Sequence, residues 1–288
     1  MIPAAFEYER ATSVDDAIAR LKAAGGAGKL IAGGHSLVPL MKLRLSQPAV
    51  LIDIAHIPDI AGVREADGDR ITIGAGTTHH DVATSPLLRE RCLAVAETAA
   101  VIGDPQVRNR GTIGGSLAHA DPAADYPAAM LALDASLRIA GPKGSRVAQA
   151  DDFFQGILTV DLAPDEILTA VTFAPTPAAA YAKLHQRASR FAIVGVAAAL
   201  DVRDGVVAEA RVAVTGAAGA PSRLGRVERA LSGQPATNET MAAVSAGAGA
   251  ELADLNEDIH ASAGYRRAMV EIFTRRALAA ALARSDAV

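Results

Sequence analysis

Apolar side chains recur with helical spacing in several parts of the chain. Over residues 13–24 they return every three or four positions, which predicts a helix. Ser13 is its candidate N-cap, and Asp15 and Asp16 are favourable in its first turn. The same spacing predicts one helix over residues 87–102, ended by Gly103-Asp104-Pro105, and a proline at the first position predicts another over 127–133.

Other apolar runs have the length and alternation of strands. The segment RITIGA at 70–75 alternates and follows a turn-rich stretch at 66–69, so it is predicted to form a hairpin with residues 62–65. Further strands are predicted at 29–32, 50–54, 135–140 and 167–173.

A composition change near residues 174–180, APTPAAA, predicts a linker between two domains. Beyond it, two alternating segments at 193–202 and 206–215 are joined by the turn Arg203-Asp204-Gly205. Three Ala-rich helical stretches follow. The last, YRRAMVEIFTRRALAAALAR, is typical of a surface helix with one packed face, and a partner-binding role stays open.

Composition excludes several classes of function. The net charge is −4 and the basic residues are dispersed, so no basic surface for nucleic acid is expected. The single cysteine, Cys92, cannot build a disulfide within the chain, an iron–sulfur cluster or a cysteine-based zinc site, and it is predicted to be a buried residue on a helix. The N-terminus lacks a signal pattern and no apolar stretch is long enough to span a membrane, so a cytoplasmic location is expected.

Two glycine-rich segments are the candidates for chemistry. The first, LIAGGHSLVPLMKLRL, is a predicted strand, a Gly33-Gly34 turn and a further apolar segment, so backbone N–H groups can face one point without Cβ atoms in the way. Ser36 adds a hydroxyl donor. For one Gly-Gly pair alone, an ordinary tight turn is the favoured interpretation.

A second glycine-rich segment makes an anion-binding role more favourable than an ordinary tight turn. Residues 111–117 repeat the paired glycines and small hydroxyl side chains in GTIGGSL, and two such turns could hold one diphosphate. The chain has no GxGxxG motif and no Walker-A lysine, which argues against Rossmann and P-loop nucleotide sites.

The histidines give weaker signals. His79 and His80 would point to opposite sides of a strand and make a poor metal pair, so structural or surface roles are expected and no metal site is predicted. His35 lies inside the first glycine-rich segment, which favours a positional role over covalent or acid–base chemistry. His119 follows the second segment, where a cofactor contact and a structural role are both open.

The segments AGGHSLVPLMKLRL and GTIGGSLAHADPAADYPA, in this order and spacing, resemble the FAD-binding medium subunits of the carbon-monoxide dehydrogenase and xanthine dehydrogenase family, the molybdenum hydroxylases. The resemblance covers nearly the whole chain. It implies an α+β fold, with a FAD-binding domain of the vanillyl-alcohol-oxidase-like type over 1–175, in subdomains of about 1–56 and 57–175. A C-terminal domain over 176–288 is expected to hold a small antiparallel sheet and a three-helix bundle.

The resemblance also implies which residues contact the cofactor. The diphosphate is expected on two stretches of backbone: Ala32, Gly33, Gly34, His35 and Ser36, and Thr112, Ile113, Gly114, Gly115 and Ser116. The other implied contacts are Asp125 near the adenosine end, Ile102 and Gly103 at the flavin ring, and Leu168 and Lys183. From its position alone, Asp125 could equally be a charge at the start of a helix. Phe191 stands where some relatives carry a tyrosine over the isoalloxazine ring, and it supplies a ring face without the hydroxyl.

The implied function is electron transfer by an oxidoreductase subunit. Iron–sulfur clusters on a small partner subunit would deliver electrons to FAD, an external acceptor would remove them, and a molybdopterin-binding large subunit would hydroxylate the substrate. A dimer of heterotrimers is the expected assembly. No catalytic residue is assigned, because the chain shows no acid–base dyad. A self-sufficient flavin oxidase and a non-catalytic assembly subunit are the alternatives, and neither the substrate nor the acceptor (quinone, NAD or oxygen) follows from the sequence.

Overall fold

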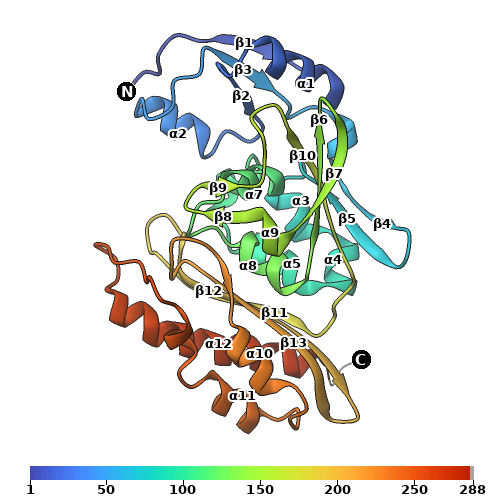
Figure 1. Ribbon diagram of the computed structural model, residues 1–288, viewed down its shortest axis with the longest axis vertical. Coiled ribbons are helices and arrows are strands. Elements are labelled where there is room, and N and C mark those ends of the chain that lie inside the picture. The colour runs from blue at the N-terminus through green and yellow to red at the C-terminus, as the bar shows by residue number, and fades with distance from the viewer. Residues whose placement is uncertain (286–288) are drawn as a thin grey trace.

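The computed structural model describes residues 1–285 as three lobes that follow one another along the longest axis of the molecule (Figure 1). The N-terminal lobe lies at one end, the middle lobe at the centre and the C-terminal lobe at the other end. None of the described helices is both long and apolar enough to cross a membrane.

The N-terminal lobe is a three-stranded parallel sheet in the order β1-β3-β2 with two helices. Its elements are β1 (Glu7–Arg10), α1 (Val14–Ala23), β2 (Gly28–Ile31), α2 (Leu37–Lys42) and β3 (Val50–Asp53). Ser13 caps α1 as predicted, because its side chain accepts a hydrogen bond from the N–H of Asp16 at 3.1 Å. The predicted strands at 29–32 and 50–54 are confirmed as β2 and β3.

The middle lobe contains a five-stranded antiparallel sheet in the order β4-β5-β10-β6-β7. Its strands are β4 (Val63–Ala66), β5 (Arg70–Gly74), β6 (Ser136–Gly141), β7 (Gly144–Gln149) and β10 (Ile167–Phe173), with a separate small hairpin of β8 (Phe154–Gly156) and β9 (Thr159–Val160). Its helices are η1 (Pro58–Ile60), α3 (His79–Thr84), α4 (Pro86–Arg91), α5 (Leu93–Ala100), α6 (Pro105–Arg108), α7 (Ile113–His119), α8 (Tyr126–Ala132) and α9 (Ala150–Phe153). The predicted hairpin before β5 is confirmed as β4 and β5.

The C-terminal lobe is a four-stranded antiparallel sheet in the order β11-β12-β13-β14. Its elements are β11 (Ala179–His185), β12 (Ala192–Arg203), β13 (Val206–Thr215), β14 (Ser222–Arg223), α10 (Gly225–Leu231), α11 (Asn238–Ser245), η2 (Ala248–Glu251) and α12 (Ala263–Ser285). One face of this sheet packs on α12 and the other on α5 and α8 of the middle lobe. The sheet is therefore buried on both faces and joins the C-terminal helices to the middle lobe.

Three local predictions were wrong. The helix over 87–102 is two helices, because Cys92 (φ −157°, ψ 68°) breaks it between α4 and α5. Cys92 is buried as expected but lies at this break, and burial raises the pKa of its thiol to about 11. His79 and His80 begin α3 and do not lie on a strand. The second glycine-rich segment starts α7 and is not a turn. Residues 174–178 of the expected linker form a loop between β10 and β11, and β11 begins at Ala179.

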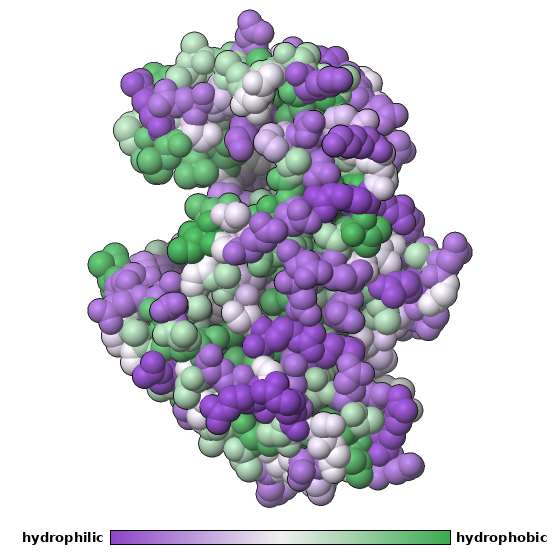
Figure 2. Space-filling model, viewed as in Figure 1, coloured by the Kyte–Doolittle hydropathy of each residue, from purple (hydrophilic) through white to green (hydrophobic). Residues whose placement is uncertain are grey.

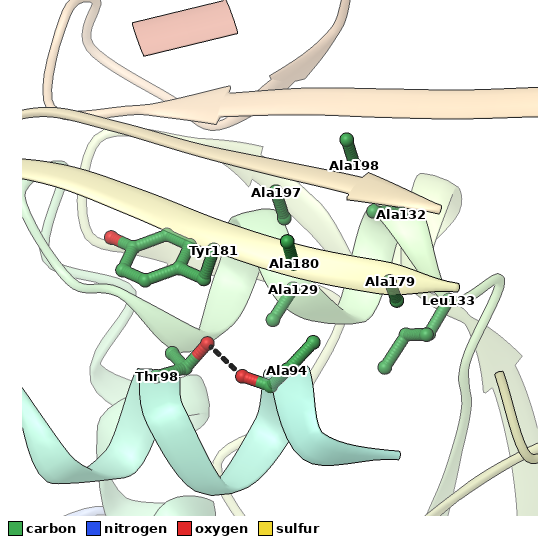
Figure 3. A pocket seen from close by; sticks show the side chains of 10 residues that line it. All are labelled: Ala94, Thr98, Ala129, Ala132, Leu133, Ala179, Ala180, Tyr181, Ala197 and Ala198. Carbon is green, nitrogen blue, oxygen red and sulfur yellow. Dashed lines mark hydrogen bonds between the residues drawn. The ribbon is translucent and has the colours of Figure 1, made fainter. Parts of the chain in front are cut away.

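Alanines fill the contact between the middle and C-terminal lobes. They line a cavity of only about 10 Å³, with Thr98 and Tyr181 at its edge (Figure 3). The alanines are Ala94, Ala129, Ala132, Ala179, Ala180, Ala197 and Ala198, contributed by α5, α8, β11 and β12. A space of this size holds about one water molecule. Small side chains therefore let the two helices approach the sheet closely without leaving a void.

His79 is buried beneath the start of the second glycine-rich segment. The residue is 5% exposed, Nδ1 shares a hydrogen bond of 3.2 Å with the Tyr126 hydroxyl, and its backbone N–H donates to Gly111 O at 2.9 Å. A Cβ on Gly111 would come within 2.6 Å of Nε2, so the segment lies directly on the ring. Burial, together with the nearby charges of His35 and Arg108, lowers the pKa of His79 from 6.5 to about 4.

This burial makes the stability of the protein depend on pH. Between pH 6.5 and about 4 the unfolded chain protonates His79 and the folded chain does not, so the free energy of unfolding falls as the pH falls through this window. At pH 5 we expect this histidine to cost about 2 kcal/mol relative to pH 7. Denaturant unfolding of the protein and of His79→Gln at both pH values measures the effect, and His79→Gln should lose that part of the dependence. An equal decrease in both proteins, or an NMR titration of His79 near 6.5, would contradict the burial argument.

Candidate functional site

The first glycine-rich segment joins β2 to α2 in the N-terminal lobe. Gly34 has φ +74°, a conformation that glycine adopts without strain. Ser36 stands at the start of α2 with no capping hydrogen bond from its side chain. The strand, the left-handed glycine and the helix start thus form a tight turn between β2 and α2.

These N–H groups have no partners within the described chain. No carbonyl or side-chain oxygen of residues 1–285 accepts a hydrogen bond from the backbone N–H of any residue from Gly33 to Leu37. Two carbonyls of the turn are in use, because Gly34 O accepts from Val38 N at 2.9 Å and Ser36 O accepts from Leu40 N at 3.3 Å. A run of consecutive free backbone N–H donors is a candidate binding surface for an anion.

The first segment touches the middle lobe directly. A Cβ on Gly33 would lie 2.2 Å from the backbone oxygen of Arg110 and 2.6 Å from the Cα of Gly111, so only glycine fits at position 33. Gly111 immediately precedes Thr112 and the second segment. The two glycine-rich segments are therefore neighbours across the junction between two lobes, where the space-filling view shows that the surface is hollowed (Figure 2).

The second segment differs from the expected turn of free donors. Thr112 caps α7, and Gly114 packs so closely on Ala75 that an added Cβ would come within 2.4 Å of the Ala75 Cβ. Four N–H groups donate within the chain: Ile113 to Thr77 O (3.0 Å), Gly114 to Ala75 O (2.8 Å), Gly115 to Thr112 Oγ1 (3.1 Å) and Ser116 to Thr112 O (3.0 Å). Three features of this segment remain available to a ligand. Gly115 is exposed, and the Thr112 N–H and the Ser116 hydroxyl have no partner among the described residues.

Asp125 is buried in a polar cluster at the boundary between the middle and C-terminal lobes. Its carboxylate accepts hydrogen bonds from the Tyr181 hydroxyl at 2.5 Å and from Lys183 Nζ at 2.8 Å, and the Asp125 and Lys183 side chains are 5% and 4% exposed. Burial raises the pKa of Asp125, and the lysine and tyrosine oppose that rise. The two predicted residues thus contact each other, and Tyr181, which the sequence analysis missed, joins them from the same face of β11.

Lys183 also connects this cluster to the expected flavin-ring residues. Its Nζ donates to Val101 O at 3.2 Å, next to Ile102 and Gly103. Gly103 has φ +49°, and the Arg108 guanidinium holds the carbonyls of Ile102 and Gly103 at 3.0 and 3.1 Å. An open cleft of about 440 Å³ adjoins them, lined in part by Val101, Tyr181, Lys183, His185 and Arg284.

The remaining predicted residues lie apart from this group. Leu168 is 4% exposed within the main hydrophobic core, so its side chain is not available to a ligand. Phe191 is 48% exposed between β11 and β12, and the next residue, Ala192, donates its N–H to Ala123 O at 3.1 Å. His35 is exposed and His119 is half-buried at the end of α7. No cluster of side chains in residues 1–285 has the composition of a metal site.

Comparisons with known proteins agree over nearly the full chain. Residues 4–177 match the family model described as the FAD binding domain in molybdopterin dehydrogenase, and residues 179–281 match the CO dehydrogenase flavoprotein C-terminal domain. The carbon monoxide dehydrogenase medium chain of Hydrogenophaga pseudoflava is 40% identical over 99% of both chains. The nicotine 6-hydroxylase medium subunit of Paenarthrobacter nicotinovorans is 36% identical over 98% of this chain and 99% of its own.

Solved structures give the same result. A chain of carbon monoxide dehydrogenase from Hydrogenophaga pseudoflava superposes with a TM-score of 0.94 over 99% of both chains, at 40% identity. A chain of quinoline 2-oxidoreductase from Pseudomonas putida 86 superposes with a TM-score of 0.91, at 30% identity, over 98% of this chain and 99% of its own. The free donors at the first glycine-rich segment fit the diphosphate of the cofactor that the matched family model names. The chain therefore belongs to the family of FAD-binding medium subunits of the molybdopterin-dependent dehydrogenases.

Proposed function

We propose that this chain carries one FAD as the electron-transfer subunit of a molybdenum hydroxylase. Iron–sulfur clusters of a small partner subunit supply the electrons, an external acceptor takes them, and a molybdopterin-binding large subunit performs the hydroxylation. The observation that carries the proposal is the run of backbone N–H groups from Gly33 to Leu37, which have no acceptor in the described part of the chain and lie where two lobes meet. The single cysteine supports the assignment of the clusters to another chain.

The diphosphate is held mainly by the first segment. Gly33, Gly34, His35 and Ser36 offer consecutive N–H donors, Ala32 leads into them from β2, and the Ser36 hydroxyl has no partner within the described chain. The second segment contributes the Thr112 N–H and the Ser116 hydroxyl, and the missing side chain of Gly115 leaves room for the cofactor. Ile113 and Gly114 hold the start of α7 against the segment that follows β5, through hydrogen bonds to Thr77 O and Ala75 O, and thereby position the second segment.

The rest of the cofactor lies along the boundary of the middle and C-terminal lobes in this proposal. Ile102 and Gly103 contact the flavin ring, Asp125 and Lys183 are polar contacts, Phe191 offers a ring face, and Leu168 supports the site from the core. FAD supplies a redox centre that accepts electrons singly and releases them singly or in pairs. The FAD-binding unit spans residues 1–175, divided near residue 56, and residues 176–288 form the C-terminal unit.

The function is tested on the assembled enzyme, with and without FAD. In the FAD-free complex we expect substrate to reduce the iron–sulfur clusters normally, followed by electron paramagnetic resonance, while reduction of the external acceptor is lost and returns when FAD is added back. Acceptor reduction at an unchanged rate without FAD would contradict the proposal. Turnover of a small substrate by this chain alone would favour a self-sufficient flavin oxidase.

Gly33→Ala tests the diphosphate site. The new Cβ would overlap Arg110 O, so the two glycine-rich segments must move apart, and we expect FAD affinity to fall by about tenfold or more. Quenching of FAD fluorescence during titration of the apoprotein measures the dissociation constant. Gly264→Ala is the matched control, because its added Cβ meets nothing within 4 Å in the first turn of α12. Equal affinities in both variants would argue against the proposed site.

Variants of Asp125 and Lys183 distinguish a role in cofactor binding from a role in packing the lobes together. Lys183→Met leaves a buried carboxylate without its cation, and we expect a loss of about 3–5 kcal/mol in the free energy of unfolding of the apoprotein. Asp125→Asn combined with Lys183→Met should regain most of this stability. If both side chains contact FAD as proposed, the double variant will unfold normally and still bind FAD weakly. If the double variant instead binds FAD as tightly as the unmodified protein, the Asp125–Lys183 pair serves only to join the lobes and does not contact the cofactor.

A further inference from the structure

Arg266 is a buried cation in the C-terminal lobe, far along the sequence from either glycine-rich segment. It lies in the first turn of α12 and is 3% exposed. A buried guanidinium is unfavourable unless its N–H groups find acceptors, so the groups that Arg266 contacts indicate what the burial achieves. The segments and residues assigned to the cofactor do not include it.

The guanidinium holds the ends of two neighbouring strands. Nη1 donates to Ile193 O at 2.7 Å and to Gly216 O at 3.0 Å, and Nη2 pairs with Asp258 Oδ2 at 2.6 Å, while Nε has no partner within the described chain. Ile193 is the second residue of β12 and Gly216 directly follows β13. One nitrogen therefore fixes two carbonyls that belong to adjacent strands at the same end of the sheet.

These strand ends approach each other closely. Gly216 has φ +81°, and a Cβ there would lie 2.6 Å from Ala192 O and 2.9 Å from Ile193 O. Asn256 assists, because its Nδ2 donates to Gly216 O at 3.2 Å and to Ala218 O at 2.8 Å. The arrangement brings several carbonyl oxygens together, and the positive charge of Arg266 offsets their mutual repulsion.

The same strand ends hold the segment that joins α7 to Asp125. Ala192 N donates to Ala123 O at 3.1 Å, and Gly216 N donates to Pro122 O at 2.8 Å. The Thr215 hydroxyl donates to Ala124 O at 2.7 Å and also contacts Pro122 O at 3.0 Å. The carbonyls of residues 122 to 124 therefore all accept hydrogen bonds from the ends of β12 and β13, whose neighbouring carbonyls Arg266 contacts.

We infer that Arg266 is a positioning residue for the FAD site. By fixing the ends of β12 and β13, it places residues 122–124, and through them Ser116 on one side and Asp125 on the other. The inference rests on the proposed function, because it takes the second glycine-rich segment and Asp125 as parts of that site.

Arg266→Met tests this role in the full-length apoprotein reconstituted with FAD. We expect the dissociation constant of FAD to rise by about tenfold and the visible circular dichroism of bound flavin to change. Val270→Ala is the matched control, because Val270 lies one turn further along α12, is fully buried in the same lobe and touches neither strand end through a polar group. This control should lower the unfolding temperature and leave the dissociation constant within about twofold.

Two further variants keep the test decisive. Asp258→Asn removes the anionic partner of Arg266. Because the Asp258 side chain is 44% exposed, this variant is expected to fold and to weaken FAD binding in the same direction by a smaller factor. Arg266→Lys should restore little, because an ammonium lacks the planar fork that reaches both carbonyls and Asp258.

The outcomes separate this inference from the proposed function. If Arg266→Met and Asp258→Asn keep the FAD dissociation constant and spectrum while Gly33→Ala loses FAD, the positioning role is wrong and the proposed site stands. If Gly33→Ala also keeps its affinity, both fail. Equal losses of affinity in Arg266→Met and Val270→Ala would mean that Arg266 only stabilises the lobe, which also overturns the inference.

Discussion

The contact between Gly33 and the backbone of Arg110 and Gly111 is the constraint on which the candidate site depends. The N-terminal lobe presents a row of free N–H donors, and the middle lobe presents a capped helix start with a hydroxyl and an exposed glycine. Neither set of groups surrounds a ligand by itself. Because a Cβ at position 33 would overlap the neighbouring carbonyl, the two sets meet only where a glycine allows the backbones to touch.

The other boundary, between the middle and C-terminal lobes, combines close packing with a few buried polar ties. Alanines bring α5 and α8 against the sheet with almost no void, which fixes the distance between the lobes. The Asp125–Lys183 pair and the contacts of Arg266 with the strand ends then fix the position of one lobe relative to the other. Buried polar groups without their partners would be costly, so these ties allow few alternative arrangements of the lobes. The precision of the site thus comes from residues distributed over all three lobes.

Family membership and local geometry contribute different parts of the functional argument. The matches over residues 4–177 and 179–281 establish which cofactor the family binds. The hydrogen-bond pattern adds that the two glycine-rich segments are not equivalent. In the first, five N–H groups have no acceptor among residues 1–285, whereas in the second the N–H groups of Ile113, Gly114, Gly115 and Ser116 are used to build α7. The glycine at 114 is explained by its closeness to Ala75, a structural reason, while the glycine at 115 is exposed toward solvent.

The sequence by itself determined most of the local structure, because capping and apolar periodicity are properties of neighbouring residues. Ser13 at the start of α1, the β4–β5 hairpin and the long strands β12 and β13 followed from such patterns. The resemblance carried by the two glycine-rich segments named the family. Only the tertiary structure decided that the helix breaks at Cys92, that the second segment is a helix start, and that Tyr181 and Arg266 belong to the polar ties. The physical reason is that the buried polar contacts join residues far apart in the chain, 56 positions for Tyr181 with Asp125 and 73 for Arg266 with Ile193. The start of α7, although Thr112 caps it locally, is also held by hydrogen bonds to Ala75 and Thr77 in a distant segment.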